Sequence, residues 1–228
     1  MGIDDPTLEP TEVDQRCPLC GAPTEVLYRD ERLLQVCTEC DDRLGNRSYY
    51  RSGTLVSTDL DPAGVHGRPL DELLNAGFVR GMRIIQSAIE GVCAVCSGPI
   101  ERWLNVFPEH ASEGMCPNCG QRYDVMVRFR CPVCKAHSEV VPSCSWLVMH
   151  HPSVVAFYHD RGIPVQYESA ERGSFQPRFQ EIDHGEEIEY ELVSTDPPRV
   201  RVTFRHEGDE LALTLDEGVN VVDVRESN

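Results

Sequence analysis

Five Cys-x-x-Cys pairs recur through the first two thirds of this 228-residue chain and limit both its folds and its chemistry. Two thiols separated by two residues can bind one metal ion from a single tight turn, and two such turns complete a tetrahedral four-cysteine site. Four of the five pairs carry Pro or Gly inside the turn or just beyond it. The sequence therefore predicts zinc binding. The pairs are Cys17/Cys20, Cys37/Cys40, Cys93/Cys96, Cys116/Cys119 and Cys131/Cys134.

The charge is strongly acidic, because 38 Asp and Glu residues outnumber 21 Lys and Arg residues and leave a net charge of −17. Lys135 is the only lysine. An acidic, lysine-poor composition is expected of proteins in a cytosol at molar salt, where salt screens charge repulsion. An ordinary acidic mesophilic protein is the alternative. In either case the charge argues against binding of the chain itself to nucleic-acid phosphates, which requires a basic face.

The start of the chain, Met1 to Asp5, is acidic and has no apolar segment behind it, so it does not resemble a secretion signal. No apolar run approaches the length of a membrane span. We therefore expect a soluble, cytoplasmic protein that does not enter the membrane. Thiols stay reduced there, so Cys-x-x-Cys indicates metal or redox chemistry. Eleven cysteines, an odd number, also fit a closed disulfide framework poorly.

The first two pairs flank a predicted hairpin. Residues 24–28 and 33–36 have the pattern of two short strands joined by a tight turn. An antiparallel hairpin returns the chain to its starting end, which brings the two cysteine turns face to face. This arrangement is the plan of a zinc ribbon, and it predicts one four-cysteine site. Its ligands are Cys17, Cys20, Cys37 and Cys40.

Apolar residues at helical spacing predict a helix over residues 69–90, and Gly91 stands where that helix would end. Such a stripe is most often part of the core; a dimer interface is the sharper alternative. A possible homodimer is therefore one expectation for the partners of this chain.

Strand geometry selects the pairing at the second metal region. Residues 99–107 and 122–130 read as strands, and antiparallel pairing places the start of the first beside the end of the second. Cys93 and Cys96 then meet Cys131 and Cys134. Because strands of this length span roughly 30 Å, the Cys116/Cys119 pair lies at the opposite end and cannot share that metal ion.

A further strand at 138–141 would carry Cys144 back toward Cys116 and Cys119, and His110 would arrive at the same end. These four residues form a candidate third zinc site. The alternative is that Cys144 is a buried thiol and His110 a surface residue. The sequence thus predicts two zinc ions and leaves a third open. Competing fourth ligands are His137, His150 and His151.

The last third of the chain predicts a helix followed by strands only. The helix begins near Trp146 and ends at Gly162, and residues 165–185 look irregular. Period-two alternation with intervening turn signals then predicts a four-stranded antiparallel meander at 188–193, 200–204, 211–215 and 219–224.

The expected fold class is α+β, with zinc-ribbon β-hairpins, two main helices and the C-terminal four-stranded antiparallel meander. The expected divisions are a linker or tail at 1–15, an N-terminal zinc ribbon at 16–45, a connecting loop at 46–68, a helix with the second zinc-ribbon region and the following helix at 69–164, and a C-terminal β domain at 165–228.

Nothing in the sequence predicts an active site. The phosphate loop, the Gly-rich dinucleotide turn, the Gly-x-Ser-x-Gly elbow and the His-Glu-x-x-His motif do not occur. Catalytic zinc keeps an open coordination position, whereas closed four-cysteine sites are structural. Because sequence does not identify a bound metal, an iron–sulfur cluster stays an alternative at any four-cysteine set. We expect a protein that is not an enzyme.

Six segments carry a resemblance to a known family over nearly the whole chain. They are DDPT at 4–7, RPLDELL at 68–74, GVCAVC at 91–96, RFRCPVCK at 128–135, HPSVVAFYHDRGI at 151–163 and TDPPRVRVTF at 195–204. Together they resemble the region that follows the winged helix in ArsR-like winged-helix (helix-turn-helix) transcriptional regulators of halophilic archaea.

The resemblance implies a place in transcription regulation, but it does not imply that these residues touch DNA. The few residues before Asp4 are too short for a winged helix, so DNA would be read only through a domain absent from this chain. The leading hypothesis is a non-enzymatic, multi-zinc regulatory or assembly region with structural zinc and a protein partner or unknown effector. The alternatives are a stand-alone zinc-ribbon protein-interaction module, and a metal or redox sensor that uses Cys116 and Cys119.

Overall fold

The computed structural model describes residues 7–17, 20–40, 53–107, 109–110, 123–142, 145–148, 151–163 and 188–227. The chain divides into two compact units. The first comprises residues 1–82 and 110–122, and the second comprises residues 83–109 and 123–228. Every strand pair among the described residues is antiparallel. The fold combines helices with these antiparallel sheets, as the sequence predicts.

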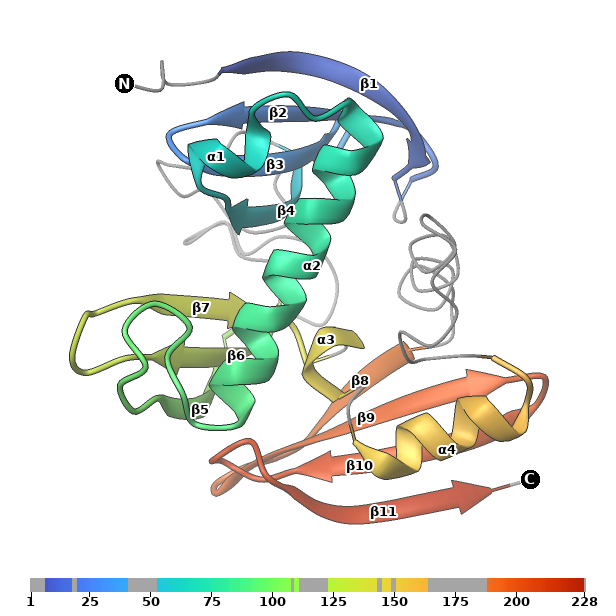
Figure 1. The fold of residues 1–228 in the computed structure, drawn as a ribbon. Helices are drawn as coiled ribbons and strands as arrows, with labels where there is room; N and C mark the ends of the chain where they lie inside the picture. Colours follow the sequence, from blue (N-terminus) through green and yellow to red (C-terminus); the bar gives the residue numbers. More distant parts are fainter. Residues whose placement is uncertain are drawn as a thin grey trace. The chain divides into compact units, whose positions relative to one another are not determined.

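A four-stranded sheet forms the centre of the first unit (Figure 1). Its strands follow the chain order β1 (Leu8–Arg16), β2 (Pro23–Arg29), β3 (Arg32–Cys37) and β4 (Thr54–Asp59). The predicted hairpin is β2 and β3, in which Thr24 lies opposite Cys37. Val26, Tyr28 and Leu33 point into one core cluster together with Leu60 and Leu73.

Two strands of this sheet lie where the sequence predicts a tail and a loop. β1 is mostly exposed, so it lacks the apolar alternation that marks a strand, and its backbone pairing with β2 holds it at the sheet edge. In β4 the buried residues are Thr54, Leu55 and Thr58, a weak apolar signal. The short helix α1 (Pro62–Val65) follows it. Pairing with neighbours, which sequence periodicity does not report, defines both strands.

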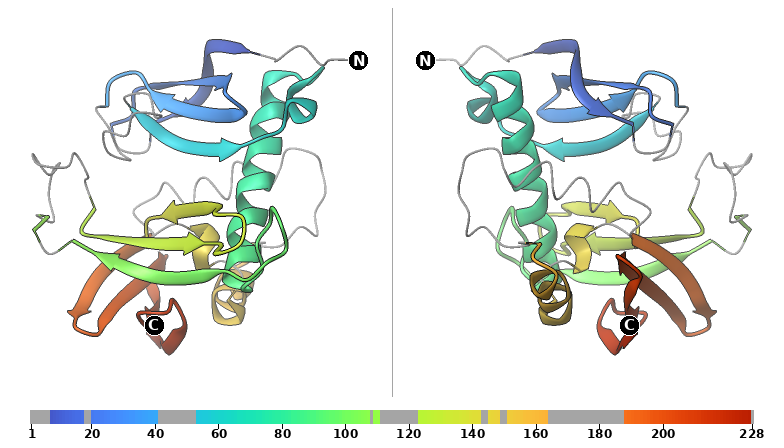
Figure 2. Two further views of the ribbon diagram at one scale, coloured as in Figure 1. Left: turned by 90° about the vertical axis from the view of Figure 1, so that its left-hand side faces the viewer. Right: turned by 90° about the vertical axis from the view of Figure 1, so that its right-hand side faces the viewer.

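Helix α2 (Leu70–Ile89) is the helix predicted over 69–90, and Figures 1 and 2 show it as one continuous element. Gly77 lies against the side chain of Leu33 on β3, since a Cβ at residue 77 would be 2.4 Å from Leu33 Cδ2. Gly91 follows at a φ of 82°, the left-handed conformation that ends helices. The buried residues of the apolar stripe, Leu73, Met82, Ile85 and Ala88, are core residues of the chain itself.

A three-stranded sheet opens the second unit. It consists of β5 (Glu101–Val106), β6 (Val125–Arg130) and β7 (His137–Val140), in that order. Glu101 lies opposite Arg130, so the start of β5 stands beside the end of β6. These are the strands and the direction that the sequence predicts.

The C-terminal sheet is the predicted four-stranded antiparallel meander. Its strands are β8 (Ile188–Thr195), β9 (Pro198–His206), β10 (Asp209–Leu215) and β11 (Val221–Ser227). Val202, Phe204 and Leu213 are fully buried on one face. Helix α4 (Pro152–Asp160) lies across that sheet (Figure 1), where the ring of Tyr158 meets the ring of Phe204 edge-on at 6.2 Å between centroids.

The single helix predicted from Trp146 to Gly162 is instead two helices, α3 (Ser145–Val148) and α4. His151 has an extended backbone with a ψ of 131°, because the ring of a following proline disfavours a helical residue before it. Pro152 then occupies the start of α4, a position that tolerates proline.

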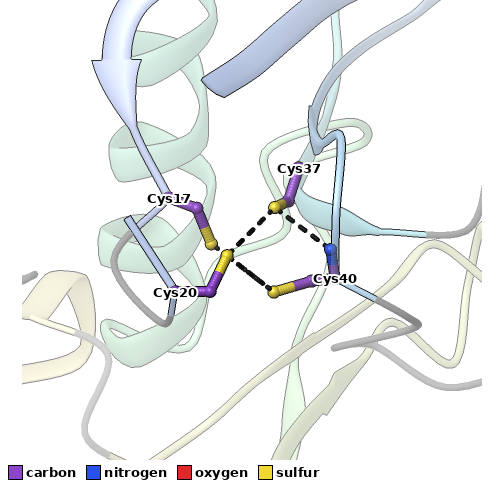
Figure 3. A group of neighbouring side chains, drawn as sticks. All are labelled: Cys17, Cys20, Cys37 and Cys40. Atoms are coloured by element: carbon purple, nitrogen blue, oxygen red, sulfur yellow. Dashed lines mark hydrogen bonds between the residues drawn. The ribbon is translucent and has the colours of Figure 1, made fainter. Parts of the chain in front are cut away.

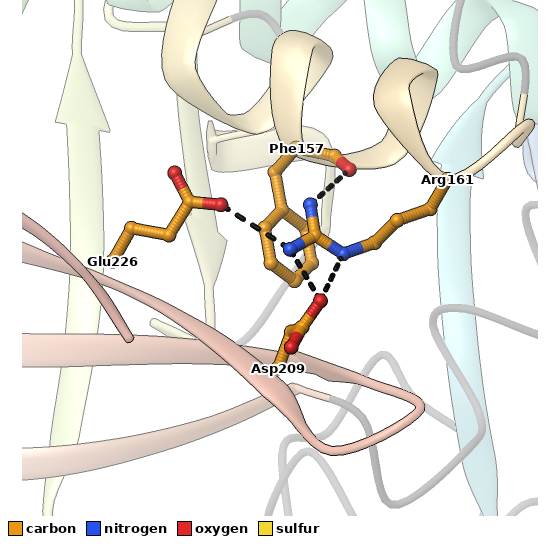
Figure 4. A network of polar contacts seen from close by, with 4 residues as sticks. All are labelled: Phe157, Arg161, Asp209 and Glu226. Atoms are coloured by element: carbon orange, nitrogen blue, oxygen red, sulfur yellow. Dashed lines mark hydrogen bonds and ion pairs between the residues drawn. The ribbon is translucent and has the colours of Figure 1, made fainter. Parts of the chain in front are cut away.

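Arg161 fastens the end of α4 to the C-terminal sheet (Figure 4). Its guanidinium group donates to Asp209 Oδ2 at 2.6 and 3.0 Å, to Glu226 Oε1 at 3.2 Å and to the carbonyl oxygen of Phe157 at 2.8 Å. It also lies 3.8 Å from the centroid of the Phe157 ring. These contacts fix the direction in which α4 crosses the sheet.

We expect Tyr28→Phe to lower the free energy of unfolding of the first unit by about 1 kcal/mol, because it removes one buried hydrogen bond without opening a cavity. The Tyr28 hydroxyl donates to the Leu60 carbonyl at 2.7 Å and holds the chain after β4 against β2. Urea unfolding at equilibrium measures the change. An unfolding midpoint equal to that of the wild type would show that this bond contributes nothing.

Candidate metal centres

The first centre joins the turn between β1 and β2 to the end of β3 (Figure 3). The four Sγ atoms lie within 4.8 Å of one another. Cys17 Sγ is 3.7 Å from Cys40 Sγ, and Cys20 Sγ is 3.6 Å from Cys37 Sγ. These are the four cysteines that the sequence assigns to the first site.

The second centre joins the turn after α2 to the turn between β6 and β7. Cys93 Sγ lies 3.6 Å from Cys134 Sγ, and Cys96 Sγ lies 3.6 Å from Cys131 Sγ. This is the pairing predicted from strand direction. It follows from the β5–β6 register, which brings the chain before Glu101 beside the chain after Arg130.

The two centres share a burial pattern. In each Cys-x-x-Cys pair the first cysteine is buried and the second is more exposed, so Cys20 and Cys96 face solvent while Cys17 and Cys93 do not. The first cysteine directly follows or ends a strand in three of the pairs, at Cys17, Cys37 and Cys131. Each site is therefore half enclosed by its own sheet and half open to water.

Three of the turns have the same backbone hydrogen bonds. The N–H of the first cysteine donates to the carbonyl five residues later, as in Cys93 to Gly98 at 2.8 Å. The N–H four residues later donates back to the carbonyl of that cysteine. This second donor has a positive φ in every case: Gly21 at 73°, Ser97 at 59° and Lys135 at 67°. The turn geometry thus outweighs the steric cost of a side chain at Ser97 and Lys135.

The turn at Cys37 is different because it rests on Gly53. The N–H of Cys37 donates to the Gly53 carbonyl at 2.8 Å. A Cβ at residue 53 would lie 2.4 Å from the Cys37 carbonyl oxygen and 2.8 Å from that of Cys40, and its φ is 79°. Glycine is required there on both counts. The sequence gives no signal for this contact, since Gly53 stands in a segment without periodicity.

Backbone N–H groups favour the thiolate form of Cys37 in the first centre and of Cys93 and Cys131 in the second, because hydrogen bonds from these groups lower the pKa of each thiol. At Cys37, burial raises the pKa, but hydrogen bonds from the N–H groups of Glu39 and Cys40 outweigh it and lower the pKa to about 7. The N–H groups of Cys134 and Val133 likewise lower the pKa of Cys131 to about 7 against the effect of burial. Burial and hydrogen bonds with the neighbouring thiols raise the pKa of Cys40 instead. The four adjacent thiols would therefore all ionise together only around a cation.

The donor set fits zinc. Zn–S bonds of about 2.3 Å in a tetrahedron place sulfur atoms about 3.8 Å apart, close to the 3.3–3.7 Å of the hydrogen-bonded sulfur pairs. Disulfide-bonded sulfurs lie about 2.0 Å apart, and these eight cysteines are free. Each cluster can therefore hold one metal ion, and four thiolates leave no coordination position for a substrate.

The candidate third site is only partly visible. Cys116, Cys119, Cys144 and the competing ligand His150 lie outside the described residues. His110 is buried, at 7% exposure, rather than at the surface. His137 is exposed at the start of β7, and His151 caps α4 through its Nδ1 atom. A third zinc ion stays a prediction.

The fold and the two clusters define a protein with two four-cysteine clusters, each of which could hold a metal ion. The chain belongs to the family described as "Domain of unknown function (DUF7351)", whose profile matches residues 14–221 and so spans both centres. Neither the curated proteins nor the solved structures include a match to the chain. Among the described residues, no helix has the length and apolar character to cross a membrane.

Replacing Cys131 and Cys134 together by serine should release one zinc ion and unfold the region around residues 93–135, because the second centre fastens β5 to β6. The site at residues 17–40 should keep its metal. Zinc counting by mass spectrometry and circular dichroism measure both effects, with the Cys17/Cys20 double variant as the matched control. If replacing Cys116 and Cys119 released the same ion as replacing Cys93 and Cys96, the pairing would be wrong.

Gly53→Ala and Gly21→Ala form a matched pair of changes at positive-φ glycines of the first centre. We expect Gly21→Ala to cost about 1 kcal/mol for the backbone conformation alone, because no atom lies within 4 Å of its added Cβ. Gly53→Ala should cost about 3 kcal/mol, since overlap with two carbonyl oxygens is added. Zinc affinity at the first centre should fall only in the second variant. Equal effects would refute the crowding argument.

Proposed function

We propose that the chain is a non-enzymatic regulatory or assembly region of a transcriptional regulator, in which zinc is structural. The observation that carries this proposal is the closure of both centres. Each brings together four cysteines from two turns, with sulfur atoms close enough to surround a single ion. Such sites convert metal-binding free energy into folding free energy and offer no position for a reacting ligand.

The regulatory part of the proposal rests on the resemblance to the region after the winged helix of ArsR-like regulators. The charge agrees with an indirect role, because a chain with a net charge of −17 is repelled by phosphate backbones. Arg128, on β6 near the second centre, pairs with Glu139 at 2.9 Å. In this proposal a winged-helix domain reads the DNA, and this chain assembles or controls it.

A stand-alone protein-interaction module is the second candidate, and one observation favours it. Val95 and Val133, the third residues of the two Cys-x-x-Cys turns at the second centre, are 69% and 64% exposed. Apolar side chains of this kind at the tip of a rigid turn can insert into a partner's pocket. Removing the metal would then abolish the interaction together with the fold.

Native mass spectrometry in ammonium acetate tests the metal part of the proposal. We expect two zinc ions per chain from the two described clusters, and a third ion if Cys116 and Cys119 complete another site. Loss of zinc to a strong chelator should unfold both ribbons, as seen by circular dichroism. A colourless protein excludes an iron–sulfur cluster. A metal-free chain with unchanged structure and unfolding midpoint would contradict a structural role.

Affinity capture from a cell lysate separates the two candidates. As a regulatory region the chain should recover a winged-helix protein, and by itself it should not retard duplex DNA in a gel. As an interaction module it should lose its partner when Val95 and Val133 are replaced by aspartate, with the metal content unchanged. Retardation of DNA by the chain alone would refute the indirect role.

A further inference from the structure

The second unit contains a cavity of about 360 Å³ that belongs to neither metal centre. The end of α2, the end of α3, the start of α4 and the β10–β11 turn surround it, and β5 contributes Arg102. The turn is tied to β5 by the N–H of Leu104, which donates to the Glu217 carbonyl at 3.0 Å. Pockets of about 300–1,000 Å³ with apolar walls and a few polar groups are typical ligand sites.

The walls of the cavity are largely aliphatic. Leu147, Val148 and Leu215 are buried residues that contribute to it, and Ile89 reaches it from the last turn of α2. An apolar molecule placed there would gain about 25 cal/mol for each Å² of surface removed from water. The walls therefore suit the hydrocarbon body of a small ligand.

Arg102 gives the cavity a fixed positive charge. Its guanidinium group donates to the Ile89 carbonyl, and from Nη2 to Asn220 Oδ1 at 2.6 Å. These bonds use two of the five N–H groups of an arginine, which is charged at every physiological pH. The group is thus held in place by the protein and keeps donors for an anion.

The β10–β11 turn braces this arginine. Asp216 accepts hydrogen bonds from the N–H groups of Gly218 at 3.0 Å and Asn220 at 2.8 Å. Burial opposes its ionisation, but these bonds and the charge of Arg102 lower the pKa of Asp216 overall. The carboxylate therefore fixes the turn, and Asn220 in turn orients Arg102.

Val219, on the same turn, lines the cavity and has a strained backbone conformation. Its φ is 63°, a left-handed conformation that a β-branched residue rarely adopts, and its side chain is only 6% exposed. Glycine adopts such angles without cost, but the glycine of this turn stands one position earlier, at residue 218, and the left-handed conformation falls on the valine. Strain of this kind persists where the surrounding structure requires the side chain, often at ligand sites.

His151 supplies a second donor. Its Nδ1 atom accepts the N–H of Ser153 at 3.3 Å, so the proton of the neutral ring is on Nε2. Burial lowers the pKa of His151, which favours that neutral form. Glu90, exposed at the edge of the cavity, adds one negative charge. It disfavours a ligand with a second carboxylate.

We propose that this cavity binds a small monocarboxylate with an apolar body. The carboxylate accepts hydrogen bonds from Arg102, and the hydrocarbon part packs against Ile89, Leu147 and Val219. The proposal does not depend on the regulatory role or on metal binding. It adds a small-molecule site between the end of α2 and the C-terminal sheet.

Calorimetric titration of the zinc-loaded protein with benzoate and with benzamide tests the proposal. The two probes have the same ring, but only benzoate is charged. We expect one benzoate site per chain and affinity for benzamide at least about 10-fold lower, as a charge-assisted hydrogen bond contributes. No benzoate binding at tens of millimolar, or equal affinity for both probes, would overturn the proposal.

Arg102→Gln should weaken benzoate binding about 10-fold and leave benzamide binding nearly unchanged. Arg201→Gln is the matched control, because Arg201 pairs with Glu191 on β8, away from the cavity; its benzoate affinity should equal the wild type. Ile89→Trp should fill the cavity and abolish the binding of both probes. If these variants fail to fold, amide chemical shifts of the wild type still decide, since benzoate must perturb His151, Val219 and Asn220. Perturbations elsewhere would overturn the proposal.

Discussion

Antiparallel pairing of short strands is the constraint on which this protein depends. A hairpin returns the chain to its starting end, so cysteines before one strand meet cysteines after the next. The pairing of β2 with β3 and of β5 with β6 produces both sulfur clusters in this way. One geometric rule, applied twice along the chain, thus builds two similar centres from unrelated sequences.

Each cysteine cluster lies at one end of a small sheet, where a bound metal ion would add folding free energy. The β5–β7 sheet has three short strands, and a chain with a net charge of −17 also repels itself. Four thiolates around one cation add folding free energy at the point where the strands end. The C-terminal sheet needs no such site, because Phe204, Leu213 and the rings of α4 supply a conventional core.

The cavity proposed to bind a ligand and the second cysteine cluster are separate sites, although both adjoin β5. The strand begins just after the second centre, and its second residue, Arg102, reaches the cavity under the C-terminal sheet. A ligand that holds Arg102 would therefore act on the same strand that the metal fastens. If the chain is a regulatory region, binding of a small molecule at Arg102 would thus act through β5 on the sheet beside the second cysteine cluster.

The sequence by itself determined the features that depend on local pattern. Cys-x-x-Cys spacing, period-two alternation and the stripe of α2 predict the cysteine pairs, the meander and the long helix, because each is defined by neighbours within a few residues. Only the tertiary structure decided what depends on distant partners. β1 is a strand through pairing with β2, Gly53 supports Cys37 across an intervening segment, and Asn220 orients Arg102. These contacts join residues whose separation along the chain leaves no periodic trace.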